Sequence, residues 1–153
     1  MRKKIQHILL SSPLLIACSF ALTGCPGGGD RMHFDETTQV ITAGDHICFL
    51  VPDAQDYQPT LIAINPKGTS SQQQTFTSNP PLVIINGQLC IPLSFYHFPD
   101  KGLFIVEYIL ASRQHADEPR SIVVGVGVSQ GRFYNIPLTN MEINRPLSEI
   151  NKE

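Results

Sequence analysis

The sequence predicts an all-β fold, a small antiparallel β-sandwich that follows an N-terminal leader. Three observations favour it. Short apolar runs alternate with turn residues along a chain of 153 residues that carries 12 prolines and 11 glycines. No stretch of useful length shows the 3.6-residue period of an amphipathic helix. Asn86-Gly87 lies between two apolar runs, which is typical of a two-residue hairpin turn.

The first residues form an export leader. Met1-Arg2-Lys3-Lys4 is cationic, and positions 5–22 are mostly apolar but interrupted by polar residues and Pro13. A spanning helix needs about 20 predominantly apolar residues, so this segment is too short and too interrupted to cross a bilayer comfortably. A charged start, an apolar core and small residues before a cut site are typical of a secretory signal peptide.

Leu22-Thr23-Gly24-Cys25 resembles the lipobox of bacterial lipoproteins. The resemblance implies cleavage between Gly24 and Cys25, a diacylglyceryl group on Cys25 and an acylated new N-terminus. Several acyl chains anchor a protein lastingly, since each buried CH₂ contributes about 0.8 kcal/mol. By analogy with lipoprotein sorting, Pro26 in place of Asp favours the outer membrane, with the domain facing the periplasm. The alternatives are a secreted protein cut near Ala17 or Ala21 and an uncleaved signal anchor.

The leader divides the chain into four expected segments, of which it is the first. We expect a signal peptide at 1–24, a lipidated cysteine with a Gly-rich tether at 25–31, a β-sandwich domain at 32–139 and a polar tail at 140–153, which forms a short helical turn or frays. Three of the eleven basic residues lie in the leader, so the remaining eight face thirteen acidic residues, a formal charge of −5. This balance argues against nucleic acid as a partner, because its binding needs a basic patch.

The cysteines predict one disulfide. Cys18 leaves with the leader and Cys25 takes the lipid, so Cys48 and Cys90 form an even pair in an oxidising compartment. Such a bridge would stabilise the domain by roughly 4 kcal/mol in the chain-entropy model. Two free thiols with a redox or metal role are the alternative, but the chain has no Cys-x-x-Cys motif.

Eight apolar runs predict strands, separated by loops that include 52–59 and a polar excursion at 70–78. The expected strands are 38–43, 46–51, 60–65, 82–85, 88–93, 103–111, 121–128 and 132–138. In 103–111 one alternating set is Phe104, Val106, Tyr108 and Leu110, and the other is Leu103, Ile105, Glu107 and Ile109, so both faces are mostly apolar and a central strand is predicted. In 121–128 the residues Ile122, Val124, Val126 and Val128 alternate with Ser121, Val123, Gly125 and Gly127, which predicts a half-buried strand. The chain has no Trp, so the Cys…Trp…Cys signature of a true immunoglobulin domain is absent, and we expect an immunoglobulin-like or related sandwich.

The Asn86-Gly87 hairpin predicts a register, because a type I′ turn sets which residues face each other. The expected pairs are Ile85 with Gln88, Ile84 with Leu89, Val83 with Cys90 and Leu82 with Ile91. Leu82, Ile84, Leu89 and Ile91 then share the core face, and Cys90 lies on the other. A disulfide buried between the sheets conflicts with this register. Either both faces of the strand are covered or the bridge lies at an edge.

No catalytic set stands out. Gly127-Val128-Ser129-Gln130-Gly131 matches the G-x-S-x-G pattern of hydrolases, which requires a helix after the serine and a later histidine. The following residues read as a strand, and the last histidine, His115, precedes Ser129. We therefore interpret this segment as a hairpin loop and expect no enzyme activity.

No metal, cofactor or small-molecule site is expected either. The histidines of the mature chain form no metal-binding motif, and a pair such as His46 with Cys48 would need further ligands and a free thiolate. The carboxylate pairs are interpreted as loop charges. The residues considered are His33, His46, His97, His115, Asp53, Asp56, Asp117 and Glu118.

Two aromatic clusters have two interpretations. Phe95-Tyr96-His97-Phe98-Pro99 and Phe133-Tyr134 follow expected strands. Aromatic residues in such places close the end of a sandwich core, which we favour, or anchor a protein partner, because they are enriched at interface hot spots.

The stretches Cys25-Pro26-Gly27-Gly28-Gly29-Asp30-Arg31-Met32-His33-Phe34 and Cys48-Phe49-Leu50-Val51-Pro52 resemble a group of small enterobacterial lipoproteins described as type VI secretion immunity periplasmic lipoproteins. The resemblance implies a membrane-anchored, periplasm-facing protein that binds a cognate toxin and neutralises it by stoichiometric occlusion. It assigns no functional residue besides Cys25. An accessory or structural lipoprotein subunit of an envelope assembly is the alternative.

Overall fold

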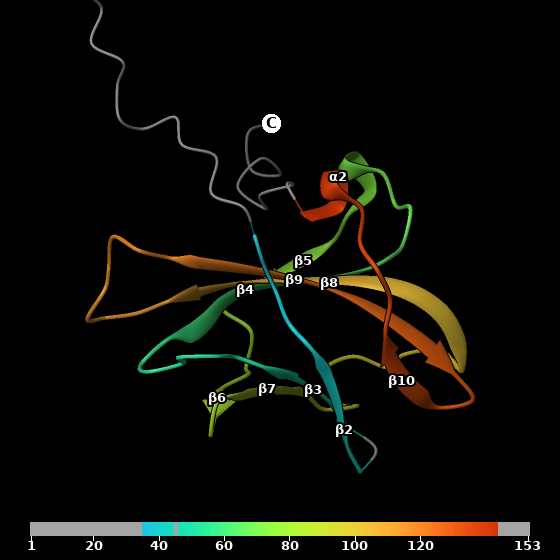
Figure 1. Ribbon diagram of the computed structural model, residues 1–153, viewed down its shortest axis with the longest axis horizontal. Helices are drawn as coiled ribbons and strands as arrows, with labels where there is room; N and C mark the ends of the chain where they lie inside the picture. The colour runs from blue at the N-terminus through green and yellow to red at the C-terminus, as the bar shows by residue number, and fades with distance from the viewer. Residues whose placement is uncertain (1–34, 45, 144–153) are drawn as a thin grey trace, which may run out of the picture. The chain divides into compact units, whose positions relative to one another are not determined.

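The computed structural model describes residues 35–44 and 46–143, which form two facing sheets (Figure 1). The large sheet has the order β1-β9-β8-β4-β5, with β10 also paired to β9. Its strands are β1 (Glu36–Thr37), β4 (Gln58–Pro66), β5 (Phe76–Ser78), β8 (Lys101–Ala111), β9 (Arg120–Ser129) and β10 (Arg132–Asn135). The small sheet has the order β2-β3-β7-β6. Its strands are β2 (Val40–Ala43), β3 (His46–Leu50), β6 (Ile84–Ile85) and β7 (Gln88–Ile91).

The predicted all-β sandwich is confirmed. Every pairing is antiparallel among the described residues except that of β1 with β9. Helix is confined there to η2 (Ser71–Gln73) and α2 (Asn140–Ile143), and neither is long enough to cross a membrane. The short α2 agrees with the helical alternative for the start of the tail.

Alternating side chains of the two sheets build the core, as sheets with one inward face require. On β8, Phe104, Val106, Tyr108 and Leu110 are buried, and β8 lies between β4 and β9 as a central strand. From the small sheet, Ile47, Phe49, Leu89 and Ile91 are buried against them. The Phe49 and Tyr108 rings meet across the sandwich with centroids 5.8 Å apart.

The Asn86-Gly87 hairpin forms as predicted next to its turn. Both residues have positive φ, 52° and 72°, as a type I′ turn needs, and the pairs Ile84 with Leu89 and Ile85 with Gln88 are present. The two outer pairs are not formed, because β6 holds only two residues. Leu82 is nevertheless buried in the core, and Val83 is 60% exposed.

The disulfide between Cys48 and Cys90 is confirmed, and its place settles the conflict in the register. The two residues face each other on neighbouring strands β3 and β7, with Cα atoms 4.0 Å apart. β3 is paired on both sides, whereas the β6–β7 ladder stops at Leu89, so β7 has β3 as its single described neighbour at Cys90. On the face opposite the core, Cys48 is fully buried and Cys90 is partly exposed, so this face is covered at Cys48 and the bridge reaches the sheet border at Cys90.

Three further predictions were wrong in part. The excursion at 70–78 contains β5, which joins the large sheet. The strand at 121–128 is not half-buried, because Val123 is 0% exposed. Residues 136–138 lie over the outer side of β9 at Gly125, where a Cβ would meet Ile136 and Leu138 and where Ile136 donates its N–H to Gly125 O at 3.0 Å. The strands expected to end at 93 and 138 end at Ile91 and Asn135, where Pro92 and Pro137 follow closely and lack the N–H that a ladder needs.

Candidate functional site

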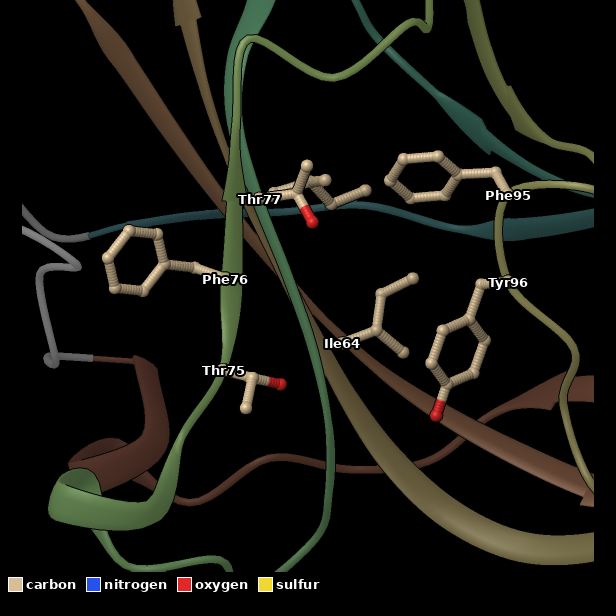
Figure 2. A pocket seen from close by; sticks show the side chains of 7 residues that line it. Ile64, Thr75, Phe76, Thr77, Phe95 and Tyr96 are labelled. Carbon is tan, nitrogen blue, oxygen red and sulfur yellow. The ribbon is translucent and has the colours of Figure 1, made fainter.

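A small groove opens between β4 and β5 on one side and the segment after β7 on the other. Its volume is about 130 Å³, close to the roughly 150 Å³ of a cavity that holds benzene. Figure 2 shows Thr77, Ile64, Phe95 and Tyr96 around this space, with the Phe76 ring on the opposite side of β5. The residues that line it are Ile62, Ile64, Thr75, Phe76, Thr77, Phe95 and Tyr96. One apolar side chain would fill it.

The aromatic wall of the groove stands on the sandwich core. Phe98 is 7% exposed, and its ring lies 5.2 Å from that of Phe104 and 5.3 Å from that of Phe133. Tyr96 contacts Phe98 edge-on at 4.6 Å, while its hydroxyl end remains half-buried at the groove. Burial raises the pKa of Tyr96. The core interpretation of this cluster is confirmed: Phe98 is buried in the core, and Phe95 and Tyr96 pack against it while remaining partly exposed at the groove.

Strand β5 forms in a polar stretch because the Asn65 side chain binds the backbone just before the strand begins. The buried Asn65 side chain accepts the N–H of Thr75 at 2.9 Å and donates to the Thr75 carbonyl at 3.0 Å. These bonds imitate a neighbouring strand and align the chain with β4. At the other end Asn79 has φ 47° and precedes Pro80, so the strand stops.

Strand β5 also exposes backbone groups. Asn79 donates its N–H to Thr60 O at 2.7 Å, and the register continues with Ser78 opposite Leu61 and Thr77 opposite Ile62. Bonded and non-bonded pairs alternate in an antiparallel ladder. The N–H and C=O groups of Phe76 and Ser78 therefore point away from β4, toward an edge that no strand of residues 35–44 or 46–143 covers.

The whole region lacks charge, a signal that sequence analysis could have found. Residues 68–99 contain no Asp, Glu, Lys or Arg, although the chain has 24 such residues in all. This run contains β5, β6, β7 and every groove residue after Ile64. Soluble proteins place charges on exposed strand edges to prevent pairing. A charge-free edge beside an apolar groove is typical of a binding surface.

A polar cluster occupies a different place, between the loop after β3 and the loop before β9. The Arg120 guanidinium donates two bonds to the Glu36 carboxylate, at 2.6 and 2.7 Å, and lies 5.3 Å from the centre of the Tyr57 ring. The Tyr57 ring stacks on His115 at 6.1 Å. Glu36 raises the pKa of Arg120. With its donors used inside the protein, this cation is held as a structural clamp between β1 and β9.

Ser112 and His115 lie close together but do not form an activated nucleophile. The Ser112 Oγ is 3.4 Å from His115 Nδ1, yet it donates its single proton to Asp56 at 2.5 Å. It also accepts the N–H groups of Gln114 and His115. A hydroxyl whose proton is already donated cannot give it to the imidazole, so the arrangement caps a loop.

Asp56 was interpreted as a loop charge, but its carboxylate also holds the loop after β8 by hydrogen bonds. Besides the Ser112 hydroxyl, its carboxylate accepts the N–H groups of Arg113 at 2.9 Å and Gln114 at 3.2 Å. The Ser112 hydrogen bond lowers the pKa of Asp56. The neighbouring Asp53, Asp117 and Glu118 are exposed.

The remaining predicted residues lie apart from the groove. Ser129 ends β9, and Gln130 and Gly131, both with positive φ, turn the chain into β10, so the segment is the predicted hairpin loop. Cys48 is bonded to Cys90 and offers no thiolate for a metal beside His46. Gly24, Cys25 and His33 lie outside the described residues, so cleavage and lipidation stay predictions.

Comparison with known proteins places the chain in one family. No curated protein and no solved structure matches it. Residues 35–131, from the start of the described domain through the turn after β9, match one family model. That match covers more than half of the chain, which therefore belongs to the family described as domain of unknown function DUF7480.

Proposed function

We propose that this chain is a membrane-anchored periplasmic lipoprotein that binds a type VI secretion toxin and neutralises it by stoichiometric occlusion. The groove beside β5 carries the proposal, because an uncharged pocket lined by aliphatic, aromatic and threonine side chains next to exposed strand groups suits a protein partner. The lipobox at Cys25 supports the anchor. The Cys48–Cys90 disulfide agrees with an oxidising compartment. Tethering would hold the inhibitor at high local concentration where a toxin enters.

The test measures binding between the full chain, purified in detergent, and the proteins encoded by its immediate gene neighbours. We expect a one-to-one complex with one neighbour at a nanomolar Kd, and survival of cells that receive this neighbour in the periplasm only when the chain is present. If no neighbour binds, the proposal is wrong. If binding is confined to a subunit of an envelope assembly, the chain is an accessory lipoprotein.

A matched pair of variants locates the surface. Thr77→Lys places a charge at the groove, so we expect it to weaken toxin binding at least tenfold. Thr42→Lys places the same charge on β2, an exposed strand of the other sheet, and should leave the Kd unchanged. Equal effects of both variants would move the binding surface away from the groove.

A further inference from the structure

We infer that the groove and the β5 edge take an extended, uncharged segment of the partner, which adds to the large sheet as a new strand and places one apolar side chain between Phe95 and Tyr96. The inference rests on the proposed function in that the partner is a protein. It goes further, because it states the conformation and the chemistry of the recognised segment.

The backbone of β5 provides the pairing groups. Phe76 and Ser78 present two N–H donors and two C=O acceptors toward the open edge, as the alternation of the β4–β5 ladder requires. Phe76 and Ser78 lie two residues apart, and an added strand forms its hydrogen bonds with every second residue of its neighbour. Main-chain bonds of this kind supply affinity in strand addition, and pockets for alternate side chains supply specificity.

Each of the other border strands either carries a charge, as β10 does with Arg132, or has an outward N–H that a side chain already binds, and this difference favours β5. The N–H of Val40 in β2 is taken by the Asn135 side chain at 2.9 Å. The N–H of Ile84 in β6 is taken by the Gln58 side chain at 2.9 Å. β1 carries Glu36, which is paired with Arg120. Strand β5 has β4 as its single neighbour among the described strands and carries no charge.

The electrostatics and the size of the groove define the added segment. Since residues 68–99 hold no charged side chain, a charged residue in the added strand would lose water without gaining a counter-ion. The groove holds about 130 Å³, enough for one branched aliphatic or aromatic side chain. The neighbouring side chains of the added strand would then point outward, toward the side on which the Phe76 ring lies (Figure 2).

A displayed library of random twelve-residue peptides tests the inference on the full chain in detergent. We expect enrichment of uncharged sequences in which apolar residues alternate. Ser78→Pro removes one outward N–H and should abolish their binding, whereas Ser70→Pro should not. Ser70 is a matched control because it is exposed, lies in the same segment and already has φ −65°, the angle of proline.

A second measurement does not depend on the fold of a variant. An enriched peptide is synthesised with N-methyl groups on alternate amides, in each of the two registers. Methylation in one register should abolish binding, and methylation in the other should be harmless. The inference is wrong if both registers behave alike, if no peptide is enriched, or if the enriched peptides are charged. It is also wrong if the chain forms a dimer that Ser78→Pro dissociates, since the edge would then pair with a second copy.

The two proposals fail separately. A toxin that binds the chain but is not displaced by the enriched peptide overturns strand addition and leaves neutralisation intact. Peptides that bind in the predicted way, while no neighbouring toxin binds, support strand addition and overturn neutralisation.

Discussion

Two glycines on β9 provide a matched test of the packing on the outer side of the large sheet. Gly125 and Gly127 lie two residues apart and share a face. A Cβ at Gly125 would collide with the Ile136 carbonyl and lie 2.7 Å from Ile136 Cγ1 and 3.1 Å from Leu138 Cδ2. The three atoms nearest to a Cβ at Gly127 belong to the end of the Tyr134 side chain, which is 45% exposed and has room to move. We therefore expect Gly125→Ala to be costly and Gly127→Ala to be tolerated.

The magnitude for Gly125→Ala combines three contributions. Overpacking costs about 1–3 kcal/mol. Displacing residues 136–138 also breaks the bond that the Ile136 N–H donates to Gly125 O, with a net loss of about 1 kcal/mol. Replacing a strand glycine returns about 0.5–1 kcal/mol. The free energy of unfolding should fall by about 2 kcal/mol for Gly125→Ala and change by less than about 1 kcal/mol for Gly127→Ala.

Urea unfolding of the two variants and the unchanged chain, followed by circular dichroism, measures this difference. Amide hydrogen exchange adds a local readout, since Gly125→Ala should expose the Ile136 N–H and Gly127→Ala should not. Equal losses of stability, or an Ile136 amide that stays protected in Gly125→Ala, would refute the placement of residues 136–138 on β9.

Three further outcomes follow from the same structure. Replacing Cys48 and Cys90 together by Ala should lower the free energy of unfolding by about 4 kcal/mol in urea titrations, because the bridge closes a loop with a sequence separation of 42; a loss below about 1 kcal/mol would contradict this. Burial raises the pKa of Asp35, whose Oδ2 has no hydrogen-bond partner. As pH rises, the unfolded chain therefore loses this proton before the folded chain does, and the free energy of unfolding falls. Asp35→Asn should raise the urea midpoint at pH 7, and this gain should disappear below the ordinary pKa of 3.8. The pKa of Asp56 is lowered instead, so its contribution is present at neutral pH and is lost as pH falls through the folded-state pKa. Asp56→Asn should therefore be less stable than the unchanged chain at pH 7, and the difference should shrink as pH falls below the ordinary pKa of 3.8.

Local signals predicted most of the fold because each acts over a few residues. Asn86-Gly87 favours positive φ at both positions, and the type I′ turn then sets the Ile84–Leu89 and Ile85–Gln88 pairs. The alternation in 103–111 predicted a central strand, since both sets of side chains are apolar apart from Glu107, and β8 lies between β4 and β9.

The candidate site was harder to predict because it depends on contacts between distant residues. Strand β5 has a polar sequence and forms through the Asn65 side chain and pairing with β4. Phe95 and Tyr96 were identified as residues that could contact a partner, but their position opposite Thr77 follows from how the two sheets face each other. The charge-free run at 68–99 was visible in the sequence, and its meaning emerged once one edge strand was found within it.

The sequence by itself determined the all-β class, the hairpin register and the identity of the disulfide partners, because backbone conformation, side-chain alternation and an even cysteine count are local or compositional properties. Tertiary structure alone decided that Cys48 and Cys90 join the neighbouring strands β3 and β7, that residues 136–138 lie over β9 at Gly125, and that β5 is the last described strand of the large sheet, beside a groove. Each of these depends on which distant segments share a surface. That choice is made by packing and by hydrogen-bond satisfaction over the whole domain.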